Sequence, residues 1–360
     1  MKILILKFRN LGDVLLVSPL IQNIKDQVKD STIDIAINDF TFPILENNPN
    51  LRNIYQYQRK YIKSKNFLRK IFLEVVFIRE IVREKYDVVI NLTEGDRGAL
   101  ISLFSFSKIR MGYLSKNFLL RKAYTIILPN QEFRHTIDTN LDPLKFLDLS
   151  IKDKKVLFYS ENWTSNQILK FDNDQPVIHI HPVSRWLFKC ISDESMAEII
   201  DFCSDELKAL VVITASSNIL ELEKVRNILS LCKSKPKNLS GKLSLHQVSA
   251  LNKESKIFIG VDTAIMHISA SNNTPSVAFF GPSGADHWGP WDNSMQESHY
   301  DCRSGVQNMG IHTVISESRA CQPCGKDGCN GSKVSDCLMN IDSQLIFKII
   351  TKKFNLVNKK

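Results

Sequence analysis

The sequence has no apolar run that approaches the roughly 20 residues of a membrane-spanning helix. Its first residues, Met1-Lys2-Ile3, lead directly into a strand-like segment, so we expect no signal peptide. No internal repeat or low-complexity tract is evident. These absences argue against a membrane-spanning protein and against a repeat array, and they predict a cytoplasmic globular chain.

Zinc-finger, RNP and helix-turn-helix signals are also absent, so we expect no nucleic-acid partner. The formal charge of +9 nevertheless indicates affinity for polyanions, which leaves an anionic membrane surface or a phosphorylated substrate. With 360 residues, of which 43% are hydrophobic and 24% charged, the chain can bury full-sized cores and predicts two domains.

A strand, a helix and a second strand follow one another between residues 256 and 280. The run Lys256–Val261 reads as a buried strand, Asp262 or Thr263 can cap the helix, and Pro275–Phe280 reads as the next strand. In such a unit the free N–H groups of the helix start point to the edge of the sheet where anions bind. An ordinary capped helix also fits this pattern. The placing of Asp262, Thr263 and His267 one helical turn apart favours a ligand site.

This segment resembles glycosyltransferase family 9, which includes the ADP-heptose:lipopolysaccharide heptosyltransferases. The family pattern, G-[VM]-D-[TS]-x-x-x-H followed by T-P-x-x-x-x-[FY]-G, is met by 260–267 and 274–281. The resemblance covers most of the chain and implies a GT-B architecture, with two Rossmann-like α/β domains that face each other across a cleft. It implies inverting transfer of a heptosyl group from ADP-heptose to an inner-core sugar of lipopolysaccharide, most like the heptosyltransferase III branch.

The domain boundaries follow from the polar stretch 160–175, which has the composition of a linker. We predict an acceptor-binding Rossmann-like domain at 1–165 and a nucleotide-sugar-binding Rossmann-like domain at 175–345. The remaining 346–360 should form a C-terminal helix and tail.

The first strand, Lys2–Phe8, ends in a loop that contains Gly12 and Asp13. Aspartate at this place often only caps the following helix. The family opens with the pattern K-x-x-x-[LH]-G-D-[VI], and the resemblance gives Asp13 the role of catalytic base that takes the proton of the acceptor hydroxyl.

The second domain opens with a strand followed by His181-Pro182-Val183-Ser184-Arg185 and Lys189. A serine hydroxyl and two cations at a strand end can bind a diphosphate, although two surface cations would give the same pattern. The string resembles H-P-[TA]-[AS]-R-x-x-x-K-x-W of the branch that adds the third heptose, with Ile191 in place of Trp. The resemblance also places Glu221 near the nucleotide ribose and Gly241 beside the adenine.

A basic cluster lies in the first domain. It contains Arg59, Lys60, Lys63, Lys65, Arg69 and Lys70, interleaved with aromatic and aliphatic residues. The following helix, Ile71–Glu84, is predicted to bury the stripe Leu68, Ile71, Phe72, Val75, Ile78 and Val82. The cluster is either a solvated face or a patch for anionic lipid or a phosphorylated glycolipid.

Acceptor contacts are expected in the same domain. Family members use basic residues there for the acidic inner-core sugars, so the resemblance nominates Arg97 together with Lys60 and Lys63. Because the acceptor is lipid-linked, we expect peripheral binding to the inner face of the inner membrane.

Half of the eight cysteines, Cys321, Cys324, Cys329 and Cys337, follow C-x2-C-x4-C-x7-C, a spacing compact enough for a structural zinc site. No histidine or second C-x2-C supports it, so reduced thiols are an equal alternative. Catalysis itself needs no cofactor if the diphosphate-binding groups neutralise the leaving group. Another nucleotide-sugar transferase, an epimerase or a hydrolase of the same architecture remains an alternative function.

Overall fold

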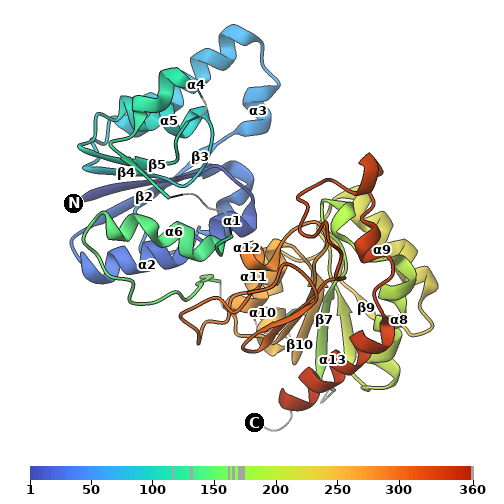
Figure 1. Cartoon of the computed structure of the whole chain (residues 1–360). Coiled ribbons are helices and arrows are strands. Elements are labelled where there is room, and N and C mark those ends of the chain that lie inside the picture. Colours follow the sequence, from blue (N-terminus) through green and yellow to red (C-terminus); the bar gives the residue numbers. More distant parts are fainter. Residues whose placement is uncertain (116, 130–132, 161–162, 164–166, 169–174, 358–360) are drawn as a thin grey trace. The chain divides into compact units, whose positions relative to one another are not determined.

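The computed structural model describes residues 1–115, 117–129, 133–160, 163, 167–168 and 175–357. The chain divides into two compact units, Met1–Tyr159 and Ser160–Lys360. Residues 161–162, 164–166 and 169–174 of the predicted linker lie outside the described residues. Each unit contains its own sheet flanked by helices (Figure 1).

In the first unit the described residues form a parallel sheet of six strands in the order β3-β2-β1-β4-β5-β6. The central strand β1 pairs with β2 on one side and with β4 on the other. Its apolar residues are buried, as expected for a parallel sheet that is covered on both faces. This explains why KILILK reads as a continuous apolar run. The strands are β1 (Lys2–Lys7), β2 (Thr32–Asn38), β3 (Asn53–Tyr57), β4 (Val88–Asn91), β5 (Ile109–Gly112) and β6 (Ile126–Ile127).

Helices cover both faces of this sheet, with α2 and α6 on one side and α4 and α5 on the other (Figure 1). Pro19 stands in the first turn of α2, where its missing N–H is not needed, and this explains the break after α1. The helices are α1 (Leu11–Leu15), α2 (Ser18–Gln27), α3 (Arg59–Lys63), α4 (Phe67–Val82), α5 (Asp96–Phe104) and α6 (Thr136–Lys145), with 3-10 turns η1 (Asp39–Ile44) and η2 (Phe118–Ala123).

The buried face of α4 differs from the predicted one. Phe77 and Ile81 are buried in a cluster with residues of β1, β3 and β4, and Leu73 and Ile78 pack against that cluster. Of the predicted stripe, Leu68, Ile71, Phe72 and Val75 are exposed. Because α4 carries apolar residues on two faces, its periodicity could not indicate which of them packs on the sheet.

In the second unit the described residues form a sheet of seven strands in the order β12-β13-β11-β10-β7-β8-β9. All neighbours pair in parallel except β12 and β13. The strands are β7 (Val177–His181), β8 (Leu210–Ile213), β9 (Lys237–Asn238), β10 (Ile257–Val261), β11 (Ser276–Phe279), β12 (Val306–Met309) and β13 (His312–Ile315). The helices are α8 (Asp193–Asp205), α9 (Ile219–Leu231), α10 (Leu245–Glu254), α11 (Ala264–Ser271), α12 (Ala285–Trp288) and α13 (Ser343–Val357), with 3-10 turns η3 (Leu187–Lys189), η4 (Cys329–Gly331) and η5 (Asp336–Leu338).

The first sheet follows the doubly wound strand order 3-2-1-4-5-6. The second sheet, counted along the chain within its unit, follows 3-2-1-4-5-7-6, so its first five strands have the same order. In such a sheet the connections run in opposite directions from the first strand, and a crevice opens at the carboxyl ends of the strands where the order reverses. These switch points lie between β1 and β4 in the first unit and between β7 and β10 in the second.

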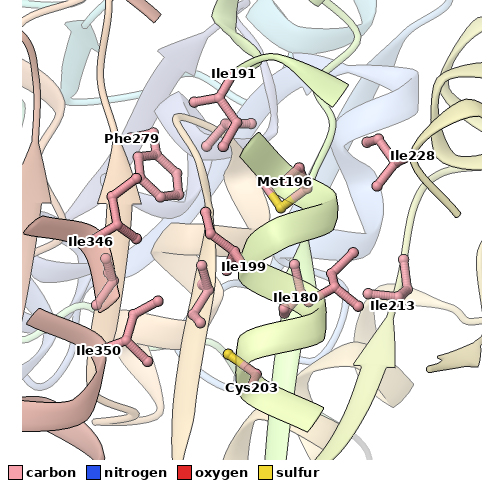
Figure 2. Packing of buried hydrophobic residues seen from close by; sticks show 14 of the residues in the cluster. Ile180, Ile191, Met196, Ile199, Cys203, Ile213, Ile228, Phe279, Ile346 and Ile350 are labelled. Atoms are coloured by element: carbon pink, nitrogen blue, oxygen red, sulfur yellow. The ribbon is translucent and has the colours of Figure 1, made fainter. Parts of the chain in front are cut away.

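The larger core of the second unit lies under α8, α9 and α13. Figure 2 shows Met196, Ile199 and Cys203 of α8 packed beside Ile346 and Ile350 of α13. The rings of Phe202 and Phe347 stack at 4.3 Å between the same two helices. The C-terminal helix is therefore part of this core.

Replacement of Ile350 by Ala should destabilise the second unit by about 2–5 kcal/mol, because a fully buried side chain leaves a cavity between α13 and α8. Urea unfolding followed by circular dichroism measures the loss. Leu345→Ala, on the exposed side of the same helix, is the matched control and should change stability by less than about 0.5 kcal/mol. Equal effects of the two substitutions would show that α13 is not docked as described.

Candidate functional site

An ion pair between Lys189 and Asp262 lies at the switch point of the second unit. Lys189 follows β7 and Asp262 follows β10, and the Lys189 Nζ atom donates to Asp262 Oδ2 at 2.5 Å. Ser283, which follows β11, donates its hydroxyl to the same oxygen at 2.5 Å. Three neighbouring strands thus deliver one charged cluster to the carboxyl edge of the sheet.

The cluster keeps Asp262 ionised. Burial by itself would raise the pKa of this carboxyl, but the charge of Lys189 and the hydrogen bonds from Lys189 and Ser283 lower the pKa overall. His267, which is buried one turn into α11, lowers it further. Without Lys189 the carboxylate would repel an anionic ligand at this edge.

Unused hydrogen-bond donors surround the ion pair. The hydroxyl oxygen of Thr263, the N-cap residue of α11, is buried and has no partner among the described residues. Ser184 is buried and accepts a bond from the Trp186 N–H at 3.2 Å, which leaves its own O–H able to donate. With the first N–H groups of α11, these donors make a cradle suited to an anion.

Arg185, Glu221 and Gly241 make their contacts elsewhere on the same edge. The exposed Arg185 guanidinium lies over the Trp186 ring, 4.7 Å from its centroid. The buried Glu221 carboxylate accepts from the Ser216 N–H at 3.1 Å and ties the loop after β8 to the start of α9. Gly241 has a φ of +71°, a conformation that disfavours other residues.

A hollow of about 350 Å³ lies at the start of α9, between this helix and the segment after β8 that ends in β9 and Ser240. Three of its six lining residues are aliphatic and one is a cation, a composition that suits a flat ring with polar edges. The lining residues are Ile219, Leu222, Val225, Arg226, Asn238 and Ser240.

In the first unit Asp13 stands at the third position of α1 and not in a loop. The Asn10 N–H donates to Asp13 Oδ2 at 3.2 Å, and the two residues form a capping box. Asp13 is only partly buried, so one carboxylate oxygen closes the helix start while the other stays available. The capping interpretation of Asp13 is therefore correct, and it does not exclude a chemical role.

Lys7 lies near Asp13 and is not among the site residues predicted from the sequence. Burial lowers the pKa of Lys7 to about 8, although the neighbouring charge of Asp13 acts to raise it. Its ammonium donates to the Leu92 carbonyl and to Asn140 Oδ1, both at 3.1 Å. A lysine that ends an otherwise apolar strand was the available signal, together with its place as the first residue of the K-x-x-x-[LH]-G-D pattern.

Arg97 is already held by protein groups. Its guanidinium pairs with both carboxylate oxygens of Glu74, at 2.9 and 3.2 Å, and donates to the Tyr57 hydroxyl at 2.6 Å. It lies 3.5 Å from the Tyr57 ring centroid. Lys60 and Lys63 on α3 are exposed instead. All three predicted acceptor residues follow strands of the first unit at its carboxyl edge.

The structure gives no support to the zinc alternative for the four cysteines. No group of three or more His, Cys, Asp or Glu side chains that could hold a metal ion occurs among the described residues, which include all four cysteines. Cys337 is part of the apolar core beside Leu338, and burial raises the pKa of its thiol to about 11, whereas Cys321 is exposed. The pattern C-x2-C-x4-C-x7-C is compact in sequence, but the fold directs its first and last members to different surroundings.

No helix in the described part of the chain is long and apolar enough to cross a membrane.

The chain is similar in sequence to known glycosyltransferases. The model of glycosyltransferase family 9 (heptosyltransferase) matches residues 75–307. Lipopolysaccharide heptosyltransferase 3 of Escherichia coli is 28% identical over 292 residues, which are 79% of this chain and 84% of the relative. The predicted family resemblance is confirmed.

Solved structures agree with this result. A family 9 glycosyl transferase from Veillonella parvula has a TM-score of 0.81 at 21% identity, with 98% of this chain and 97% of that chain covered. E. coli heptosyltransferase WaaC with ADP has a TM-score of 0.68 at 15% identity, with 98% and 100% covered. The predicted α/β, GT-B-like fold class is confirmed.

Replacement of Lys189 by Met should change how the free energy of unfolding depends on pH, because Asp262 loses its cationic partner. In the wild type the lowered pKa of Asp262 stabilises the fold above the ordinary carboxyl pKa, and this contribution is lost as the pH falls through the lowered value. In the variant burial dominates and raises that pKa. We expect a deficit of about 3–5 kcal/mol near neutral pH that shrinks toward about pH 4, measured by urea unfolding.

The double variant Lys189→Met/Asp262→Asn is the control, because it removes the buried charge as well as its partner. It should recover much of the lost stability. A deficit that is the same at both pH values, without recovery in the double variant, would contradict the ion-pair assignment.

Proposed function

Because the chain belongs to glycosyltransferase family 9, we propose that this glycosyltransferase moves a heptosyl group from ADP-heptose to an inner-core sugar of lipopolysaccharide, with inversion at the anomeric carbon. The observation that carries the proposal is the anion cradle at the β7/β10 switch point, where Lys189, Ser184 and Thr263 surround the start of α11. The sugar and the nucleotide come from the similar proteins, which are lipopolysaccharide heptosyltransferase 3 and WaaC with ADP, both of E. coli.

The diphosphate of the donor would lie over the cradle. A lysine ammonium has three N–H donors, so Lys189 can keep its bond to Asp262 and still donate to phosphate oxygens. The hydroxyls of Ser184 and Thr263 and the free N–H groups of α11 add neutral donors. Since these groups stabilise the negative charge that develops on departing ADP, they perform the electrostatic part of the catalysis.

Asp13 would act as the general base. Its free carboxylate oxygen takes the proton of the acceptor hydroxyl, the hydroxyl oxygen forms a bond to the anomeric carbon, and the bond from that carbon to the ADP oxygen breaks. One displacement of this kind inverts the anomeric configuration. Lys7, the buried residue near Asp13, would place a positive charge beside the carboxylate.

The acceptor would bind along the carboxyl edge of the first unit. Lys60 and Lys63 are exposed on α3 and can meet acidic groups of an inner-core sugar. Arg97, which Glu74 and Tyr57 hold, is partly exposed and would add a third positive charge. Because such an acceptor is lipid-linked, the proposal includes peripheral binding at the cytoplasmic face of the inner membrane. The hollow at the start of α9, the helix that carries Glu221, would take the adenosine.

Product analysis tests the proposal. The protein is incubated with ADP-heptose, with and without a lipopolysaccharide core acceptor that lacks the terminal heptose. Transfer predicts ADP release and an added heptose only when the acceptor is present. Release of free heptose, or a changed donor epimer without acceptor, would instead identify a hydrolase or an epimerase.

Asp13→Asn should reduce transfer about 100-fold or more and leave ADP affinity unchanged. Asparagine keeps an oxygen that can accept from the Asn10 N–H, so the start of α1 is preserved. Steady-state kinetics and calorimetry with ADP measure the two effects.

Asn10→Ala is the control, because it weakens the same capping box without removing the carboxylate. It should lower stability more than it lowers the transfer rate at saturating substrate. Wild-type turnover in Asp13→Asn would remove Asp13 from the mechanism.

Thr263→Val should weaken ADP binding about threefold to tenfold, because it removes an unused hydroxyl donor from the cradle while it keeps the side-chain shape. Stability should not fall, since that hydroxyl bonds to no described group. Thr274→Val is the matched control, because the Thr274 hydroxyl donates to the Asn252 carbonyl at 2.7 Å inside the same unit. It should lower stability and leave ADP affinity intact, and the reverse pattern would place the phosphates elsewhere.

A further inference from the structure

The outward side of α4 carries a continuous apolar surface. Phe67, Leu68 and Phe72 are 72%, 78% and 63% exposed. We call the full set the α4 apolar face, and it consists of Phe67, Leu68, Ile71, Phe72, Val75 and Val76. The spacing i, i+1, i+4, i+5 places these residues in one stripe, about 15 Å long at the helical rise per residue.

This face is not the side that holds α4 in the fold. Phe77 and Ile81, on the opposite side of the helix, are the residues buried against the sheet. The apolar face therefore adds nothing to the core of its unit, and water contact with it is unfavourable. Single exposed apolar residues are ordinary, but a contiguous stripe of aromatic and branched side chains marks an interaction surface.

Positive charge surrounds the N-terminal end of the face. Six cations and no acidic residue occur between 59 and 73, and the next residue, Glu74, is paired with Arg97. Arg69 is exposed on α4, and Lys65 lies 4.2 Å from the ring centroid of Tyr61, which is itself exposed on α3. An apolar stripe bordered by lysine, arginine and tyrosine is typical of helices that lie in a membrane interface.

The positive charge beside the α4 apolar face favours anionic lipid over a second copy of the chain as its binding partner. A second copy of the chain would bring two such cationic clusters together, which like-charge repulsion opposes. A surface of anionic lipid offers both the apolar layer and the negative headgroups. A stripe of this length fits a helix that lies in the plane of the surface, because a helix across the hydrocarbon layer must extend about 30 Å.

We propose that the α4 apolar face inserts into an anionic lipid surface, with Lys65 and Arg69 at the headgroups. The inference rests on the proposed function for its purpose, since a lipid-linked acceptor would be met at such a surface. Binding to lipid needs neither donor nor acceptor, so it is measured independently of transfer.

The test is sedimentation of the whole chain with vesicles of phosphatidylcholine, with or without about 30% phosphatidylglycerol. The wild type should bind the anionic vesicles at least about tenfold more tightly than the neutral ones. Phe67→Gln/Leu68→Gln/Phe72→Gln should reduce binding to anionic vesicles about tenfold or more, because it removes apolar area and keeps helix-forming residues.

Two matched controls locate the effect. Phe104→Gln/Phe118→Gln/Leu119→Gln removes the same residue types from other exposed positions of the same unit and should bind as the wild type does. Lys65→Gln/Arg69→Gln should lower binding to anionic vesicles only, while Lys208→Gln/Lys233→Gln, with the same charge change in the other unit, should have little effect.

Transfer to a short soluble core oligosaccharide should stay at the wild-type rate in the α4 apolar variant. Absent transfer in the wild type would defeat the proposed function and leave the vesicle result standing. Three outcomes would overturn the lipid inference: no wild-type binding to anionic vesicles, equal binding by the α4 variant, or a dimer in analytical ultracentrifugation that the α4 substitutions dissociate.

Discussion

Reversal of strand order beside the first strand of each sheet is the constraint on which the site depends. At β7 and β10 the chain departs to opposite faces, so the segments that follow these strands meet above the sheet edge and no connection crosses between them. Lys189 and Asp262 come together there across 73 positions of sequence. The ion pair makes the edge usable by an anion, because it leaves a buried carboxylate neutralised and a cation with donors to spare.

Much of this arrangement could be predicted from sequence, because it depends on local signals. Buried strands followed by capping residues indicated β1, β10 and α11, and the strand ends indicated Asp13, Thr263 and Ser184. The pairing of Lys189 with Asp262 could not be predicted, since both were selected separately as ligand contacts and their contact depends on the strand order. The cysteine spacing could not decide between zinc and reduced thiols for a related reason, because coordination depends on where the fold places each thiol and not on its distance along the chain.

The outcome for α4 shows a different limit. A helix with one apolar face has only one way to pack, so periodicity suffices to identify its buried side. Helix α4 is apolar on two opposite faces, one with Leu68, Ile71, Phe72 and Val75 and the other with Leu73, Phe77 and Ile81. The sequence alone does not indicate which of these faces is buried. Tertiary packing chose the side with Phe77 because Phe8 and Tyr57 meet its ring edge to face, at 6.3 and 5.3 Å between centroids.

The packing of α4 through its Phe77 side connects the α4 apolar face to the region of Asp13. Glu74 lies on α4 between the exposed and the buried faces, and burial acts to raise its pKa while bonds from Arg97 and Tyr57 lower it overall, so the carboxylate stays charged and bonded. Arg97 in turn lies over Tyr57 and the ring of Phe8, the residue that follows β1 and leads toward Asp13. Every contact in this series is inside one compact unit. A lipid surface bound to the α4 apolar face would therefore lie at a set distance from the Asp13 carboxylate. The proposed lipid-linked acceptor requires such a fixed distance if its hydroxyl is to reach Asp13, the proposed base.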